Sequence, residues 1–458
     1  MAANEKSRKT PPDNNDDQAR GSSSGGGKRQ QGSPVYLVDG ARTPFIKARG
    51  KPGPFSPVDL AVQCGRPLLM RQPIPFSAYD QVILGCVNVL PEEMNPARIA
   101  ALRMGLDETT SAFTVQINCG SGMQSIDTAY KTIREGSGDL ILAGGTEALS
   151  KAPMMLSEEA AQWLAGLSAA SGPQEYARQL ARFNPKEFKP QISLIKGLKD
   201  PIEELSMGQT AEVVAQHFHI SRQQADAYAV SSHQRLAKAQ QEGWLAGEVV
   251  PAIANDGRFF EFDDGVRPDT SEETLAALKP TFEPPYGQVT AGNSSQITDG
   301  ASWIIVASEA AVKKYRLQPR AVILDSEWSA LNPKVMGLAP TLCAGEILKR
   351  HKSGLNDIDL WEINEAFAAQ VLACVAAWED KEFCQVALGL NEPMGRLEKS
   401  RLNVDGGAVA IGHPVGTSGN RIVLHLMNTL QRKKLKRGIA TECIGGGQGG
   451  AMMIEAVT

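Results

Sequence analysis

The chain has 458 residues, of which 42% are hydrophobic and 21% charged, and its formal net charge is −4. This length predicts two or three structural units, and the composition is typical of a globular protein. The charge balance gives no electrostatic reason to expect a nucleic-acid partner, and no apolar run approaches the roughly 20 residues that span a bilayer.

The seven cysteines are scattered and form no CxxC pair. This spacing argues against a disulfide framework or a structural zinc site and favours a reducing, cytoplasmic location. The polar stretch 1–33 is expected to be a disordered tail, because it holds almost nothing to bury. It has neither the apolar segment of a secretory signal nor the acid-poor composition of a mitochondrial presequence.

The first ordered elements are predicted to form a parallel βαβ unit. A helix over 122–136 is expected from the apolar stripe that contains Met123, Ile126 and Ala129. Apolar runs typical of strands occur at 35–45, where Gly40 is expected to end the strand, and at 80–89, 111–118 and 139–145.

Residues 151–285 break this rhythm and are interpreted as an inserted lobe over the first half. Helices are predicted at 158–170, 173–183 and 220–243, the last opened by a serine cap. Regular structure is expected to resume within 287–308.

The C-terminal portion repeats the earlier pattern, with a helix expected within 416–438 and a strand running into glycines at 439–447. Two similar halves indicate a duplication, with a site where matching loops converge. The segment GGGQGG at 445–450 formally matches a dinucleotide-binding motif, but too little chain follows for the helix and the acid that this motif needs.

Cys119 is the first candidate catalytic residue, because it lies between a predicted strand and a predicted helix. The helix dipole at that position is expected to lower the pKa of the thiol, and Gly120 and Gly122 leave room for a substrate. The alternative is a packed structural cysteine.

A thiol nucleophile usually needs a base, and His413 is the candidate because it lies in a glycine-rich turn before Pro414. His217, His219, His233 and His425 are expected on helices in surface or packing roles, and His351 near a helix end in solvent. Taken alone, Cys443 is a core candidate, and Asn364 a helix cap.

Five segments, in this order and at these separations, resemble the thiolase family: NCGSGMQS, AGNSSQITDGA, NEAFAAQ, GGAVAIGHPVGTSG and CIGGGQGGAM. The resemblance covers residues 34–457. It implies an α/β, five-layer αβαβα fold with two similar doubly wound halves. The expected domains are a half over 34–310 that includes a coenzyme A-binding loop domain at 151–285, and a second half over 311–458.

The resemblance also implies residue roles. Cys119 would be the acyl-accepting nucleophile, His413 its base, and Cys443 the acid/base for the α-carbon. Asn364 would hold a water that forms one oxyanion hole with His413, while the N–H groups of Cys119 and Gly445 would form the second. Met207, Ser295, Ala366 and Phe367 match positions that line the tunnel for the pantetheine arm.

The implied reaction is thiolytic cleavage of 3-oxoacyl-CoA, as in β-oxidation, or the reverse condensation. It needs a covalent acyl carrier, a proton donor for carbon and oriented donors for an oxyanion, and therefore no metal or cofactor beyond coenzyme A as substrate. Ketoacyl synthases are an alternative, although they usually lack a second catalytic cysteine. A silent acyl-CoA-binding scaffold is another.

Some features depart from the family pattern. Gln116 stands where the family usually has Asn, which leaves the support of the nucleophile loop open. The segments 151–206 and 380–403 resemble β-subunits of the fatty-acid oxidation complex, which often have His at the position of Asn364. The expected partners are a second copy in a homodimer or homotetramer, and an α-subunit. The apolar segment 190–200 is interpreted either as a docking surface or as a tunnel wall.

Overall fold

A computed structural model describes residues 33–457, so the predicted tail over 1–33 lies almost entirely outside the described residues. Their central feature is a ten-stranded mixed sheet in the order β12-β13-β14-β11-β1-β10-β5-β3-β4, with the short β2 beside β10. Strands from early in the chain lie at one end of this sheet order, and strands from late in the chain lie at the other end. This is the separation into two halves that the sequence indicates.

In the N-terminal half, β3 pairs in parallel with β4 and β5, and β10 runs antiparallel to β5 and β1. The helix α3 (Ser121–Arg134) connects β4 to β5, which confirms the predicted parallel βαβ unit. The first strand continues past Gly40 to Arg42, because both residues pair with β10. The strands are β1 (Val35–Arg42), β2 (Ile46–Lys47), β3 (Gln81–Gly85), β4 (Ser111–Val115), β5 (Leu140–Ala148) and β10 (Thr298–Ser308).

The C-terminal half repeats this arrangement. Its β12 and β13 are parallel, and β14 runs antiparallel to β13 and β11, as β10 does to β5 and β1. The helix α15 (Val415–Lys433) precedes β13 just as α3 precedes β5. The strands are β11 (Ala321–Ala330), β12 (Leu360–Ile363), β13 (Arg437–Ile444) and β14 (Gln448–Ala456). The halves join where Tyr36 and Leu37 of β1 pair with Val322 and Ala321 of β11.

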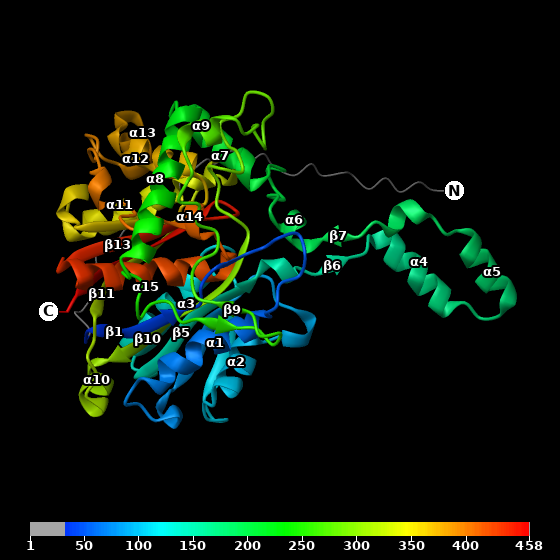
Figure 1. Ribbon diagram of the computed structural model, residues 1–458, viewed down its shortest axis with the longest axis horizontal. Helices are drawn as coiled ribbons and strands as arrows, with labels where there is room; N and C mark the ends of the chain where they lie inside the picture. The colour runs from blue at the N-terminus through cyan, green and yellow to red at the C-terminus, as the bar shows by residue number, and fades with distance from the viewer. Residues whose placement is uncertain (1–32, 458) are drawn as a thin grey trace, which may run out of the picture. The chain divides into compact units, whose positions relative to one another are not determined.

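Helices complete five layers, as expected (Figure 1). The helices α1 (Pro57–Met70) and α2 (Pro96–Met104) pack on the N-terminal strands, and α11 (Ala339–His351) with α12 (Ala368–Glu379) packs on the C-terminal strands. The helices α3 and α15 form the middle layer between the two sets of strands. A Cβ atom at Gly122 would lie 2.7 Å from the backbone nitrogen of Asn420, so glycine permits the close approach of the two helices.

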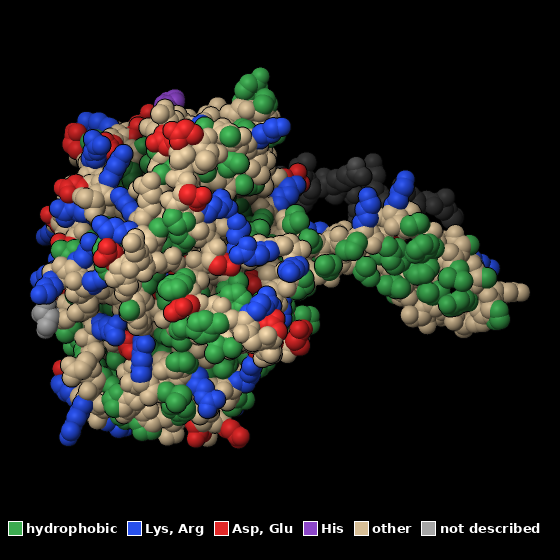
Figure 2. All heavy atoms as spheres, in the orientation of Figure 1, with side chains coloured by type: hydrophobic (Ala, Val, Ile, Leu, Met, Phe, Trp, Pro, Cys, Tyr) green, Lys and Arg blue, Asp and Glu red, His purple; other side chains and the backbone are tan. Residues whose placement is uncertain are grey.

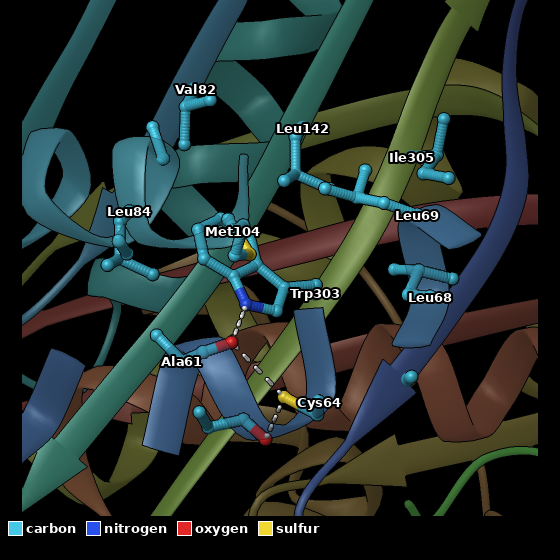
Figure 3. Close-up of a cluster of buried hydrophobic side chains, with 14 of the residues drawn as sticks. Ala61, Cys64, Leu68, Leu69, Val82, Leu84, Met104, Leu142, Trp303 and Ile305 are labelled. Carbon is cyan, nitrogen blue, oxygen red and sulfur yellow. Dashed lines mark hydrogen bonds between the residues drawn. The ribbon is translucent and has the colours of Figure 1, made fainter. Parts of the chain in front are cut away.

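An apolar core lies between α1, α2 and the N-terminal strands (Figure 3). Its centre is Trp303 of β10, which is fully buried with Met104 and Leu142 and donates from its indole nitrogen to the carbonyl oxygen of Ala61 at 2.9 Å. Burying each such large apolar side chain stabilises the fold by about 1.5–3 kcal/mol. The indole hydrogen bond satisfies the one polar atom that this side chain brings into the core.

The inserted segment leaves the sheet after β5 and returns at β10. Its helices α7 (Met207–His217) and α8 (Arg222–Gln241) pack against α12, and α8 also packs against α14 (Ala408–Ile411). The expectation of a lobe lying over the first half therefore holds only in part. The helices α7 and α8 pack against C-terminal helices, while Leu236 and Ala239 of α8 also pack with Phe45 of the first half. His219 lies in the turn after α7, not on a helix as predicted.

The earlier part of the insertion forms a helical hairpin, α4 (Glu158–Ala169) and α5 (Pro173–Ala181), beyond the β6–β7 ribbon (Figure 1). The rings of Trp163, Phe183 and Phe188 pack together with centroids 5.0–5.3 Å apart. Figure 2 shows hydrophobic side chains gathered on this hairpin. The remaining short elements of the insertion are β6 (Met154–Met155), β7 (Gln191–Ile192), α6 (Ser193–Gly197), β8 (Ala252–Ile253), β9 (Phe259–Phe260) and α9 (Glu272–Ala276).

Two further helices are α10 (Glu309–Tyr315) and α13 (Lys381–Leu388). Within residues 33–457, every helix is too short or too polar to span a membrane.

A buried ion-pair network ties α15 to its surroundings. The imidazole of His425 lies 2.9 Å from an Oε of Glu248 and 3.3 Å from an Oδ of Asp405. Burial alone would lower the pKa of His425, but the two carboxylates outweigh it and raise the pKa to about 10. His425 is therefore a buried cation, a stronger role than the surface or packing role expected from sequence.

Replacing His425 by leucine is expected to lower the free energy of unfolding by about 3 kcal/mol near pH 6, because two buried carboxylates lose a cation. The folded pKa lies above the unfolded value of about 6.5. The contribution is therefore complete below that value and is lost as pH rises through about 10. Urea unfolding at pH 6 and pH 10.5 checks this, with His351→Leu as the partly exposed control. An equal loss at both pH values would contradict it.

Candidate active site

Cys119 lies in a short loop between β4 and α3, directly before Gly120, the residue that caps α3. The loop is held by Ser121, whose hydroxyl accepts from the backbone nitrogen of Ile117 at 2.9 Å and donates to the carbonyl oxygen of Asn118 at 2.7 Å. These bonds close the loop locally, so the thiol is carried at a fixed place at the start of the helix.

The pKa of Cys119 differs in sign from the sequence expectation. Burial raises it to about 12, although a hydrogen bond from the backbone nitrogen of Gly445 acts in the opposite direction. The prediction of a lowered pKa was wrong because it counted the helix dipole and not the desolvation by surrounding chain. Cys119 is therefore a neutral thiol at neutral pH and needs a base to become a nucleophile.

His413 lies in the turn between α14 and α15, where its backbone nitrogen donates to the carbonyl oxygen of Gln296 at 2.9 Å. Its Nδ1 is 2.6 Å from the hydroxyl of Ser418, and its buried Nε2 has no hydrogen-bond partner among the described residues. Burial lowers the pKa of His413 to about 4, and the nearby charge of Arg421 acts in the same direction. The ring is therefore neutral near pH 7 and can accept a proton.

Asn364 follows β12, and its backbone nitrogen donates to the carbonyl oxygen of Thr441 at 2.9 Å. Its Nδ2 lies 3.5 Å from Nδ1 of His413, while its Oδ1 has no partner among the described residues. Asn364 does not cap a helix, because Phe367 is the residue that caps α12. The helix-cap alternative from the sequence is therefore wrong.

Cys443 lies near the end of β13 and is fully buried. Burial raises the pKa of its thiol well above the ordinary value, and the nearby sulfur of Cys119 adds to the rise. Cys443 thus carries its proton at neutral pH. Gly445 follows the strand, and its backbone N–H acts to lower the pKa of the Cys119 thiol.

A cavity of about 450 Å³ brings most of the candidate residues together. Cys119, His413 and Cys443 all line it. The residues expected along the pantetheine tunnel also line it, namely Met207, Ser295, Ala366 and Phe367. Asn364 and Gly445 are not part of this lining.

A second cavity of about 450 Å³ also reaches Cys119, and Gly445 lines it. The two cavities share Leu194 and Leu198, which lie in the apolar segment 190–200. Leu194 and Leu198 agree with the tunnel-wall interpretation, while Ile192 and Ile195 of the same segment are exposed, so the docking interpretation stays a prediction. Cys119 is therefore part of the lining of both cavities.

Several residues near the site were missed from sequence. Lys47 and Arg267 line the first cavity, where they supply positive charge. Glu365 accepts hydrogen bonds from Tyr228 at 2.9 Å and Ser232 at 2.7 Å, which ties the loop of Asn364 to α8. No local pattern marks these residues, because each partner is distant in sequence.

Ser418 could have been found, since it lies five residues after His413 in the same glycine-rich block. Its hydroxyl lies 3.3 Å from the carbonyl oxygen of Pro414 and donates to it. Because the hydroxyl proton of Ser418 is used in this way, the hydroxyl oxygen of Ser418 accepts from Nδ1–H of His413, which leaves the lone pair on Nε2 free to take a proton.

Replacing Ser418 by alanine is expected to lower kcat of the reaction proposed below by about tenfold, because the base loses the partner that fixes its tautomer. The measurement is kcat and KM, with the melting temperature as the folding control. Unchanged kcat in a folded variant would contradict this role.

No group of three or more His, Cys, Asp or Glu side chains within residues 33–457 is arranged to hold a metal ion. The side chains that do converge are two thiols and an imidazole, which suit nucleophilic and acid–base chemistry.

Comparisons with known proteins agree with the resemblance seen in sequence. The model of the thiolase N-terminal domain matches residues 35–310, and that of the C-terminal domain matches residues 317–456. A beta-ketoadipyl-CoA thiolase of Pseudomonas aeruginosa is 36% identical, over 92% of this chain and 99% of that protein. A probable acetyl-CoA acyltransferase of Staphylococcus aureus is 36% identical, over 92% of this chain and 98% of its own length.

Among solved structures, human mitochondrial 3-ketoacyl-CoA thiolase matches with a TM-score of 0.80 and 34% identity, over 93% of this chain and 99% of that one. The Bacillus anthracis acetyl-CoA acetyltransferase matches with a TM-score of 0.79 and 34% identity, over the same shares of the two chains. The chain belongs to the thiolase family and is an enzyme of the acyltransferase class.

Proposed function

We propose that this enzyme cleaves 3-oxoacyl-CoA with coenzyme A to acyl-CoA and acetyl-CoA, reversibly, through an acyl group carried on Cys119. The observation that carries the proposal is that Cys119, His413 and Cys443 line one cavity. The substrate class is supported by relatives whose names specify 3-ketoacyl-CoA and beta-ketoadipyl-CoA.

The first half of the proposed reaction uses all three side chains. Nε2 of His413 takes the proton of Cys119 as the sulfur bonds to C3 of the substrate. The bond between C2 and C3 then breaks, and its electron pair goes to C2, where the thioester oxygen shares the charge as an enolate. Cys443 gives its proton to C2, which completes acetyl-CoA and leaves the acyl group on Cys119.

In the second half, the thiol of coenzyme A gives its proton to the thiolate of Cys443, and its sulfur attacks the acyl carbon. The bond to Cys119 then breaks, and the leaving sulfur takes back the proton that His413 holds. The N–H groups of Cys119 and Gly445 are proposed to hold the acyl oxygen during this step. His413 and a water held by Asn364 are proposed to hold the enolate oxygen of the first half. No further cofactor is required by this sequence of steps.

The two cavities suggest how the substrate lies. The first is lined by Met207 and Phe367 and by the cations Lys47 and Arg267, which suits an apolar arm that ends in phosphates. The second begins at Cys119 and is the proposed place for the acyl chain.

The test is to mix the protein with acetoacetyl-CoA and coenzyme A and to follow the loss of the 3-oxoacyl absorbance. Turnover is expected, with the same rate after treatment with EDTA. Binding without turnover would indicate a silent acyl-CoA-binding scaffold, and condensation that needs a malonyl thioester would indicate a ketoacyl synthase. Either result would reject the proposal. A ladder of 3-oxoacyl-CoA lengths would then establish the chain-length preference.

A further inference from the structure

We propose that Asn118 is a positioning residue that holds Gly445 against the nucleophile loop, an inference that rests on the proposed function. Its Nδ2 donates a hydrogen bond to the carbonyl oxygen of Gly445 at 2.9 Å. The two residues are far apart in sequence, so this bond joins the loop of the N-terminal half to the loop of the C-terminal half.

The loop that carries Gly445 has no side chain of its own that could hold it in place, because residues 445–447 are all glycine. It connects β13 to β14 through three glycines, and Gly446 and Gly447 have φ angles of +93° and +78°. The far end is held by a bond from the nitrogen of Leu331 to the carbonyl oxygen of Gly447, at 2.7 Å. The near end, which carries Gly445, is held by Asn118.

The backbone of Asn118 is held in place by the nucleophile loop. Asn118 has a φ angle of +46°, in the left-handed region that asparagine tolerates better than most residues. Its own carbonyl oxygen accepts from both the hydroxyl and the backbone nitrogen of Ser121, at 2.7 Å and 3.1 Å. The loop therefore fixes the backbone, and Asn118 also lines the second cavity beside Gly445.

The consequence is chemical, because Gly445 lines the second cavity together with Cys119, and its backbone N–H acts to lower the pKa of that thiol. When the thiol loses its proton, this N–H stabilises the negative charge on the sulfur, and in the acyl-enzyme it is one of the two proposed donors to the acyl oxygen. In this role Asn118 acts through Gly445, and its own side chain also lines the second cavity. Gln116 stands where the family usually has Asn, which left the support of the nucleophile loop open. The contact between Asn118 and Gly445 supplies such support.

Two variants test the anchor in the full-length protein. Asn118→Gly keeps the left-handed backbone and removes the side chain, while Asn118→Asp keeps the shape and replaces the donor by an acceptor that faces a carbonyl oxygen. Thiolysis of acetoacetyl-CoA is expected to fall in kcat by roughly threefold to tenfold for Gly and by about tenfold to a hundredfold for Asp. KM for coenzyme A should stay within about twofold, because Asn118 and Gly445 do not line the first cavity.

A second readout is independent of turnover. Alkylation of Cys119 by iodoacetamide at fixed pH should slow in both variants, because the thiolate loses a fixed N–H donor. Lys352→Gly is the matched control, since Lys352 also has a left-handed backbone (φ +51°) at the exposed end of α11. Its kcat and alkylation rate should equal those of the unchanged protein.

Unchanged kcat and alkylation in either folded Asn118 variant would overturn the anchor. An equal fall in kcat and rise in KM, with unchanged alkylation, would also overturn it, because that pattern indicates a general disturbance of the site. If the unchanged protein does not cleave acetoacetyl-CoA, the proposed function fails, while the alkylation rates still decide whether Asn118 holds Gly445.

Discussion

Replacing Cys119 by serine is expected to lower kcat for thiolysis of acetoacetyl-CoA by at least about 10⁴-fold, because the covalent route is lost. A serine hydroxyl at the same place is a much weaker nucleophile than a thiol. Since burial already raises the pKa of the thiol to about 12, the site relies on His413 to remove a proton. The measurements are the rate and the mass of the protein after incubation with acetyl-CoA.

The unchanged protein should gain one acetyl group on the peptide that contains Cys119, and the serine variant should gain none. Cys384→Ser is the control, because Cys384 is a free cysteine that lies buried in α13 and lines neither cavity. Full turnover by Cys119→Ser would reject the proposed mechanism. Loss of turnover in Cys384→Ser without loss of folded protein would show that the assay does not isolate the nucleophile.

The elements that could be predicted from sequence are those with a strong local signal. The helix α3 was found from its apolar stripe, and α8 from Ser221, whose hydroxyl accepts from the nitrogen of Gln224. The fold class was found from five separated blocks that resemble one family. The position of the inserted helices was not predicted. Their apolar faces indicate that each helix is buried on one side, but they do not identify the element against which it packs.

The candidate site divides in the same way. Cys119 and His413 were chosen because each lies in a glycine-rich turn before a helix, and the matching halves bring those turns to one cavity. The sign of the thiol pKa was not predictable, because desolvation depends on parts of the chain that are distant in sequence. The same reason applies to the bond from Asn118 to Gly445 and to the ion pair between His425 and Glu248.

Replacing Cys443 by serine is expected to slow thiolysis by about 100- to 10,000-fold while Cys119 can still be acylated, because the two cysteines are proposed to act at different carbons. Burial raises the pKa of the Cys443 thiol well above its ordinary value, so at neutral pH the sulfur is protonated and can donate this proton to C2. A serine hydroxyl is a weaker acid than a thiol and gives up its proton more slowly. The acylation of Cys119 and the protonation of C2 must therefore be measured separately to show that the two cysteines have different roles.

Two measurements make that separation. Incubation with acetyl-CoA should still label the Cys443→Ser variant on Cys119, as detected by mass. Exchange of the methyl hydrogens of acetyl-CoA in deuterated water, which requires proton removal from the α-carbon, should be slowed about as much as thiolysis. A variant that cannot be labelled at all would place Cys443 in the acylation step. A variant that is labelled and exchanges at the normal rate would assign carbon protonation to another group in the cavity, for which the neutral imidazole of His413 is the remaining candidate.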